Sequence, residues 1–140
     1  LQYQAKVLGN LGTLYLDSDR VTDALDCFLK DIERSQLIGD IVSQAKTLNN
    51  LAIAYRRLGK PEQALNCYQN CIAIQNELGN TSDLISTWLN MANLYRIENN
   101  YSAMRDVLER ALAASESLND LEKIAQIKEM LQQNTQEGSQ

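Results

Sequence analysis

The chain has 140 residues, of which 44% are hydrophobic and 22% are charged, and its formal net charge is −5. This length suits one domain with a sizeable core, and the acidic balance argues against a nucleic-acid-binding module, which normally needs a basic face. No apolar run approaches the roughly 18 residues of a membrane span, so we expect no membrane partner.

The chain contains no histidine and three cysteines, Cys27, Cys67 and Cys71. Without histidine it cannot assemble a Ser–His or Cys–His relay, and it has no glycine-rich phosphate loop. Cys67 and Cys71 could share a helix face, but a metal site there would lack further ligands. We therefore expect no catalytic residue, no metal, no cofactor and no enzymatic activity.

The cysteines are best interpreted as small buried hydrophobic residues in a reducing, cytoplasmic setting. No signal peptide is visible, although the chain opens with Leu1 rather than Met and is interpreted as a fragment of a longer protein.

The first two predicted helices cover about residues 1–17 and 21–37. In the first, apolar and small residues recur at the spacing i, i+3, i+4, i+7 of a single packing stripe, at Leu8, Leu11, Gly12 and Tyr15. The polar run 17–20 marks the turn between the two helices.

The next two helices are predicted at 41–57 and 61–77. Gly59 suits the end of the first, and Pro61 suits the first turn of the second. A packing stripe in the second consists of Ala64, Leu65, Tyr68, Cys71 and Ile72.

The last pair is predicted at 81–97 and 101–117, with a polar turn at 98–100. One further amphipathic helix over 121–133 is interpreted as a cap for the last pair, and the polar tail 134–140 is expected to be disordered.

The breaks between pairs carry helix-end signals. Residues suited to a left-handed helix terminus are Gly39, Gly79 and Asn119. Residues suited to the N-cap of the following helix are Asp40, Asn80 and Asp120.

The three pairs are copies of one unit with a forty-residue offset. Aligned positions across the copies are Leu11, Leu51 and Met91; Gly12, Ala52 and Ala92; Tyr15, Tyr55 and Tyr95; and Phe28, Tyr68 and Leu108. The small residues would let the paired helices approach closely. A lone hairpin cannot bury such stripes, so the units, at about 1–39, 40–79 and 80–119, should stack into an all-α solenoid.

The pattern Leu8-x2-Leu11-Gly12-x2-Tyr15, followed by Ala24-x3-Phe28, resembles the tetratricopeptide repeat. Met104 stands where this family has a small alanine, the closing proline is missing, and the period is forty residues. These departures resemble the longer repeats of kinesin light chains, Pins-type polarity adaptors and bacterial peptide-sensing regulators. The resemblance implies a right-handed α-solenoid and a protein-interaction scaffold, in which the first helix of each unit lines a concave groove for a peptide or helix.

The face of these first helices opposite the packing stripe is the predicted groove. Asparagine costs about half a kcal/mol relative to alanine inside a helix, yet it recurs there in one phase at Asn10, Asn50 and Asn90. Its carboxamide offers a donor and an acceptor to the main chain of an extended ligand. The alternative is that these asparagines bond to a neighbouring helix. The predicted site comprises Lys6, Asn10, Thr13, Lys46, Asn50, Ile53, Arg57, Asn90, Asn93 and Arg96.

Basic residues gather on or beside this face, whereas the second helices carry most acidic residues, Asp31 among them. This distribution favours an acidic peptide as the partner. The alternative function is a structural or self-associating solenoid segment without a dedicated peptide ligand. An exposed N-terminal edge around Val7, Leu14 and Leu16 could then form a homodimer.

Overall fold

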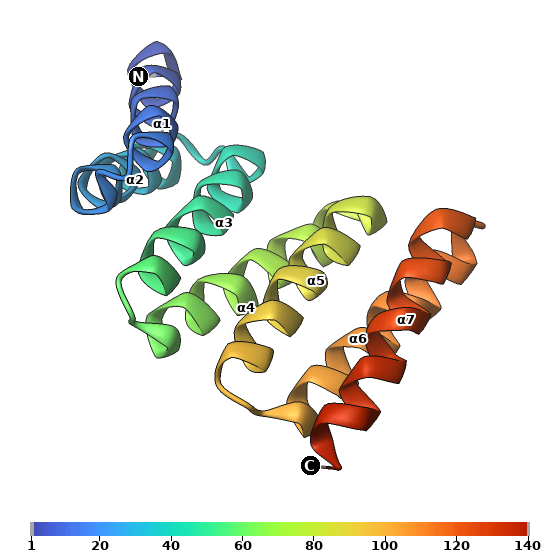
Figure 1. Ribbon diagram of the computed structural model, residues 1–140. Coiled ribbons are helices and arrows are strands. Elements are labelled where there is room, and N and C mark those ends of the chain that lie inside the picture. Colours follow the sequence, from blue (N-terminus) through green and yellow to red (C-terminus); the bar gives the residue numbers. More distant parts are fainter. Residues whose placement is uncertain (1, 140) are drawn as a thin grey trace. The chain divides into compact units, whose positions relative to one another are not determined.

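The computed structural model describes residues 2–139, with side chains from residue 7 onward, and over this range it has seven helices and no strand (Figure 1). The helices are α1 (Gln2–Asp17), α2 (Val21–Ile38), α3 (Ile41–Arg57), α4 (Pro61–Leu78), α5 (Thr81–Ile97), α6 (Tyr101–Ser117) and α7 (Leu121–Gly138). The predicted helical hairpins are therefore confirmed.

A left-handed residue separates each helix from the next, and these residues recur every twenty positions. Their φ angles lie between 55° and 71°. They are Asp19, Gly39, Gly59, Gly79, Asn99 and Asn119. A Cβ added at any of the three glycines would meet nothing within 4 Å, so the backbone conformation, not crowding, explains glycine there.

The predicted N-caps are confirmed. The side chains of Asp40, Asn80 and Asp120 each accept a hydrogen bond from the backbone N–H three residues later. Asn100 does the same at the start of α6, where the sequence had indicated only a polar turn. Each bond satisfies one of the backbone donors that a helix start leaves without an intrahelical partner.

Two compact units make up the described chain, and the division falls between Glu77 and Leu78. In the first unit α2 packs against both α1 and α3. Gly12 lets α1 approach α2 closely, since a Cβ at this position would lie 2.5 Å from Cε1 of Phe28. The predicted role of a small residue in close helix packing is therefore confirmed at Gly12.

Helix α4 contacts α3 through Cys71, a residue of its apolar stripe. The Cys71 thiol donates a hydrogen bond to the carbonyl oxygen of Ala45 at 3.2 Å, and Ala64, Tyr68 and Cys71 are buried.

The second unit consists mainly of α5, α6 and α7, in which α6 packs against both neighbours. Its buried residues include Ala92, Leu108 and Ile127. Residues 134–138 are helical, so the predicted disordered tail is wrong for this segment. The reason is a long-range contact: Asn134 is buried, and its Nδ2 donates to the carbonyl oxygen of Tyr101 at 3.0 Å.

The predicted N-terminal edge is only partly exposed. Val7 and Leu14 are exposed, but Leu16 is only 7% exposed and belongs to the core. Leu11, expected to be packed, is 38% exposed, whereas its counterparts Leu51 and Met91 are buried. None of the described helices is long and apolar enough to cross a membrane.

Candidate functional site

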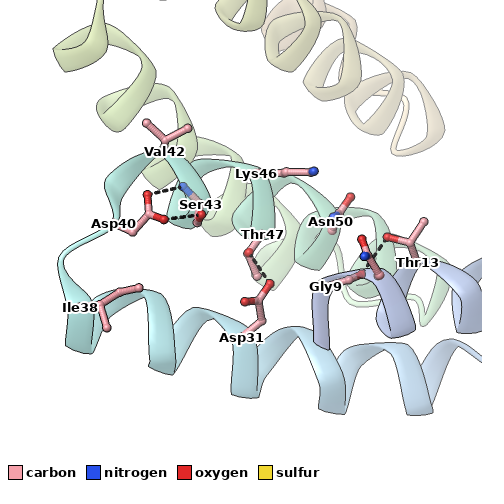
Figure 2. A pocket seen from close by; sticks show the side chains of 11 residues that line it. Gly9, Thr13, Asp31, Ile38, Asp40, Val42, Ser43, Lys46, Thr47 and Asn50 are labelled. Atoms are coloured by element: carbon pink, nitrogen blue, oxygen red, sulfur yellow. Dashed lines mark hydrogen bonds between the residues drawn. The ribbon is translucent and has the colours of Figure 1, made fainter. Parts of the chain in front are cut away.

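A pocket of about 520 Å³ opens between α1, α2 and α3 in the first unit (Figure 2). Four residues of the predicted groove contribute to its lining, namely Asn10, Thr13, Lys46 and Asn50. The other lining residues are Gly9, Asp31, Ile38, Asp40, Val42, Ser43 and Thr47. The α3 residues 42, 46 and 50 are one helical turn apart, so they line the same side of the helix.

Asn50 is half-buried, and within the part of the chain that the structure describes its carboxamide has no hydrogen-bond partner. The alternative interpretation, a bond that fixes a neighbouring helix, therefore finds no support at Asn50. The Thr13 hydroxyl donates to the Gly9 carbonyl oxygen of its own helix at 3.0 Å. Lys46 is exposed and forms no ion pair with any described side chain.

Asp31 comes from α2 and is only 6% exposed. The Thr47 hydroxyl donates to its Oδ2 at 2.8 Å, and a Cβ at Gly9 would lie 3.0 Å from the same oxygen (Figure 2). Burial raises the pKa of the Asp31 carboxyl, although the Thr47 hydrogen bond and the Lys46 charge act in the opposite direction.

Asp31 was not among the predicted site residues, because acidic residues of the second helices are usually exposed. A signal was nevertheless present. The same position in the other units is occupied by Cys71 and Ala111, which are small and buried, so a carboxylate there had to be buried as well.

Asp40 lies at the start of α3, where its side chain caps the helix. Its carboxylate accepts hydrogen bonds from the backbone N–H of Ser43 at 3.1 Å and from the Ser43 hydroxyl at 2.7 Å. These hydrogen bonds lower the pKa of Asp40. Asp31 is therefore the pocket carboxylate that has one oxygen without a hydrogen-bond partner among the described residues.

Two predicted residues of the first unit whose side chains the structure describes, Ile53 and Arg57, do not line the pocket. Arg57 has a structural contact instead: its Nη1 donates to the carbonyl oxygen of Leu16 at 2.9 Å, near the end of α1. Ile53 is half-buried, and the side chain of Lys6 lies outside the described residues.

The remaining predicted residues belong to α5 in the second unit. Asn90 is half-buried, and Asn93 and Arg96 are exposed. Their part in a groove stays a prediction.

All three cysteines are free thiols and buried. Burial, with the neighbouring Cys71, raises the pKa of Cys67 to about 11. In the described chain no group of three or more cysteine, aspartate or glutamate side chains is placed to hold a metal ion.

Hairpins repeated every forty residues, with small residues at the helix crossings, define a helical-repeat protein. The family model for the tetratricopeptide repeat matches residues 3–77 and again residues 43–117. The chain belongs to the tetratricopeptide repeat family.

Solved structures agree with this assignment. BtubC from P. vanneervenii is 18% identical with a TM-score of 0.74, and the match covers 94% of this chain and 63% of BtubC. A putative kinesin light chain from Podosopora anserina is 16% identical with a TM-score of 0.78, covering 96% of this chain and 67% of that protein.

The first TPR of Spaghetti (RPAP3), bound to the HSP90 peptide SRMEEVD, is 22% identical with a TM-score of 0.65, covering 89% of this chain and 92% of that one. At these identities the comparisons establish the fold, and they confirm the predicted class of repeated helical hairpins. No curated protein sequence is similar enough to count as a match.

Proposed function

We propose that the chain is a non-catalytic interaction module that binds a peptide or short helical segment of another protein, and that the pocket between α1, α2 and α3 is one of its contact regions. The observation that carries this proposal is the unpartnered Asn50 carboxamide beside a cavity of about 520 Å³. Tetratricopeptide repeats generally mediate protein–protein interactions, and the Spaghetti repeat domain was solved with a bound peptide.

The chemistry of the lining suits an extended peptide. A carboxamide such as that of Asn50 can donate to a ligand carbonyl and accept from a ligand N–H at the same time. The cavity beside it is large enough to receive a side chain of the same peptide. Main-chain hydrogen bonds would then provide affinity, and the pocket would provide specificity.

The test is retention of peptides from an immobilised random heptapeptide library by the wild-type chain and by Asn50→Ala. We expect Asn50→Ala to lower the affinity for the selected peptides about 3- to 10-fold, the value of a neutral hydrogen bond. The matched control is Asn70→Ala, the same change at an exposed position of α4, which should leave binding unchanged. The proposal fails if no peptide is selected, or if Asn50→Ala binds as well as the control.

The second candidate function is self-association of a structural segment, favoured by the exposed side chains of Val7 and Leu14 on α1. It predicts a dimer whose population rises with concentration in light scattering and falls in Leu14→Glu. A monomer at all concentrations would exclude it.

The proposed partner is a protein, because a net charge of −5 disfavours nucleic acid and anionic lipid surfaces. The free, buried cysteines fit a reducing compartment such as the cytoplasm. The predicted preference for an acidic peptide finds little support at the pocket, which places Asp31 and Asp40 near Lys46.

A further inference from the structure

The repeat itself does not require a carboxylate at position 31. The corresponding positions of the other two units hold Cys71 and Ala111, both fully buried and neither charged. A small side chain therefore satisfies the packing at this point of the hairpin. Asp31 places an ionisable group in the same surroundings, where burial disfavours its charge.

The Asp31 carboxylate is also only half satisfied. Oδ2 accepts the Thr47 hydroxyl, and Oδ1 has no hydrogen-bond partner within the described residues. Figure 2 shows this second oxygen free of any dashed contact, and Asp31 is part of the pocket lining. A buried carboxylate is stable when it is paired and its lone pairs are occupied, so the pocket offers an acceptor that a ligand can complete.

The chain does not complete it internally. Lys46 and Asp31 line the same pocket, but no ion pair joins them among the described side chains. Asp40 is committed to Ser43 and the start of α3. Helix α1 faces the carboxylate with a glycine, since a Cβ at position 9 would lie 3.0 Å from Oδ2.

We propose that the Asp31 carboxylate at this pocket receives a lysine or arginine side chain of the bound peptide. This inference rests on the proposed function and adds to it the chemistry of one ligand residue. A cationic side chain supplies both the charge and the N–H donors that the carboxylate lacks, whereas an acidic side chain would be repelled.

The experiment uses the same immobilised heptapeptide library with the wild-type chain, Asp31→Asn and Glu33→Gln. Glu33→Gln is the matched control, since it removes one carboxylate charge from an exposed position on the same helix. We expect wild type and control to enrich lysine or arginine at one peptide position, and Asp31→Asn to lose that enrichment.

The strongest selected peptide is then resynthesised with citrulline in place of arginine, or norleucine in place of lysine. We expect this neutral replacement to weaken binding to wild type about 10- to 100-fold, as for a charge-assisted hydrogen bond, and to change binding to Asp31→Asn very little. Should Asp31→Asn fail to fold, Asp31→Cys replaces it, because cysteine is the residue at the equivalent position 71.

Selected peptides without a preferred cation, or an equal effect of the neutral replacement on both chains, would overturn the inference while leaving peptide binding intact. The inference would also be overturned, with peptide binding intact, by peptides that bind wild type and Asp31→Asn with equal affinity but bind Asn50→Ala more weakly. If no peptide is retained at all, the proposed function fails together with it.

Discussion

The charge of Asp31 affects the stability of the fold, and the same carboxylate is the proposed contact for a cationic residue of the ligand. Its ionised form is disfavoured by burial, so the raised pKa means that the folded state binds this proton more tightly than the unfolded state does. The stability that the protonated carboxyl contributes is fully present below the unfolded pKa of about 4, and it is lost as the pH rises through the folded pKa.

Asp31→Asn should therefore raise the free energy of unfolding by about 1 kcal/mol at pH 7, with the gain shrinking towards zero below about pH 4. The asparagine oxygen can still accept the Thr47 hydroxyl. Urea unfolding at both pH values, for this variant and for Glu33→Gln, measures the effect. An equal change at pH 4 and pH 7 would contradict it.

The unfolding free energy of Asp31→Asn must be compared with that of the wild type, because neighbouring charges also shift the pKa of Asp31. Lys46 and Arg34 lower the pKa of Asp31, and Asp40 raises it. Asp40 itself has a lowered pKa, so its own contribution is present above the unfolded pKa and is lost as the pH falls. Both chains contain these groups, so the difference isolates Asp31.

Gly12 makes a second prediction about a single residue. Gly12→Ala would normally favour a helix, but its Cβ would lie 2.5 Å from the fully buried ring of Phe28. We expect a net loss of about 1 to 3 kcal/mol in the free energy of unfolding. Gly138→Ala is the control, since its Cβ would make an ordinary contact of 3.4 Å with Tyr101. A stabilised Gly12→Ala would show that α1 and α2 can separate at no cost.

At the scale of helices, all six turns between consecutive helices contain a residue with positive φ, although only three of these residues are glycine. Asn119→Gly should stabilise the chain by about 0.5 to 1 kcal/mol, because glycine adopts a positive φ without strain. Gly59→Ala should cost about 1 kcal/mol or more for the opposite reason, although space for its Cβ is free. Thermal melting of the two variants measures both effects, and the same sign for both would refute this explanation.

The end of α7 is joined to α6 by a hydrogen bond from the buried Asn134 side chain and by one from Arg105 to the Thr135 hydroxyl. Asn134→Ala removes the donor to the Tyr101 carbonyl oxygen, so we expect a loss of about 1 to 2 kcal/mol and fraying of residues 134–138. Hydrogen exchange of the backbone amides in this segment, compared with an unchanged pattern in α5, measures it. Unaltered protection in residues 134–138 would show that the helix end is stable by itself.

The helices, turns and caps could be predicted because their signals are local. Asp40 lies three residues from the N–H that it caps, and Gly39 adopts its left-handed conformation within the same turn. Asn134 could not be predicted, because its polar side chain is buried by a partner 33 positions away in the sequence. The burial of Asp31 could have been predicted from the small buried residues at the same position of the other units, but its contacts with Thr47 and Gly9 could not, since only the fold brings these residues to it.

In the candidate site, too, the features that depend on local sequence could be predicted, and those that depend on the fold could not. Asn10, Lys46 and Asn50 line one pocket, as the sequence predicted. The prediction was possible because the helical periodicity of the repeat shows which residues lie on the same face of a helix. Helical periodicity could not predict that the Arg57 side chain donates a hydrogen bond to the carbonyl oxygen of Leu16, which belongs to another helix.

At the scale of the whole molecule, unfolding of the two compact units can be followed separately, because they contain different reporter residues. All three cysteines precede Glu77, whereas Trp88, the single tryptophan, follows Leu78. The thiols are buried, so alkylation at pH 8 should be slow in the native chain and should report the opening of the first unit. Tryptophan fluorescence should report the second.

Because repeat arrays gain stability from each unit and its neighbours, Gly12→Ala should lower the urea midpoint of thiol labelling more than that of Trp88 fluorescence. Asn134→Ala should have the reverse preference. Identical shifts of both midpoints in both variants would show that the described chain unfolds as a single cooperative block.

The left-handed residues at twenty-residue intervals also make the chain divisible. Each turn ends one helix and starts another with contacts that reach only a few residues, so a block such as 40–79 includes its own cap and its own terminating glycine. Duplicating that block at the Gly39–Asp40 junction would preserve the phase of every stripe, whereas one residue added inside a helix would rotate all later side chains by about 100°. We therefore expect the array to accept an additional forty-residue block with the phase of its helices unchanged.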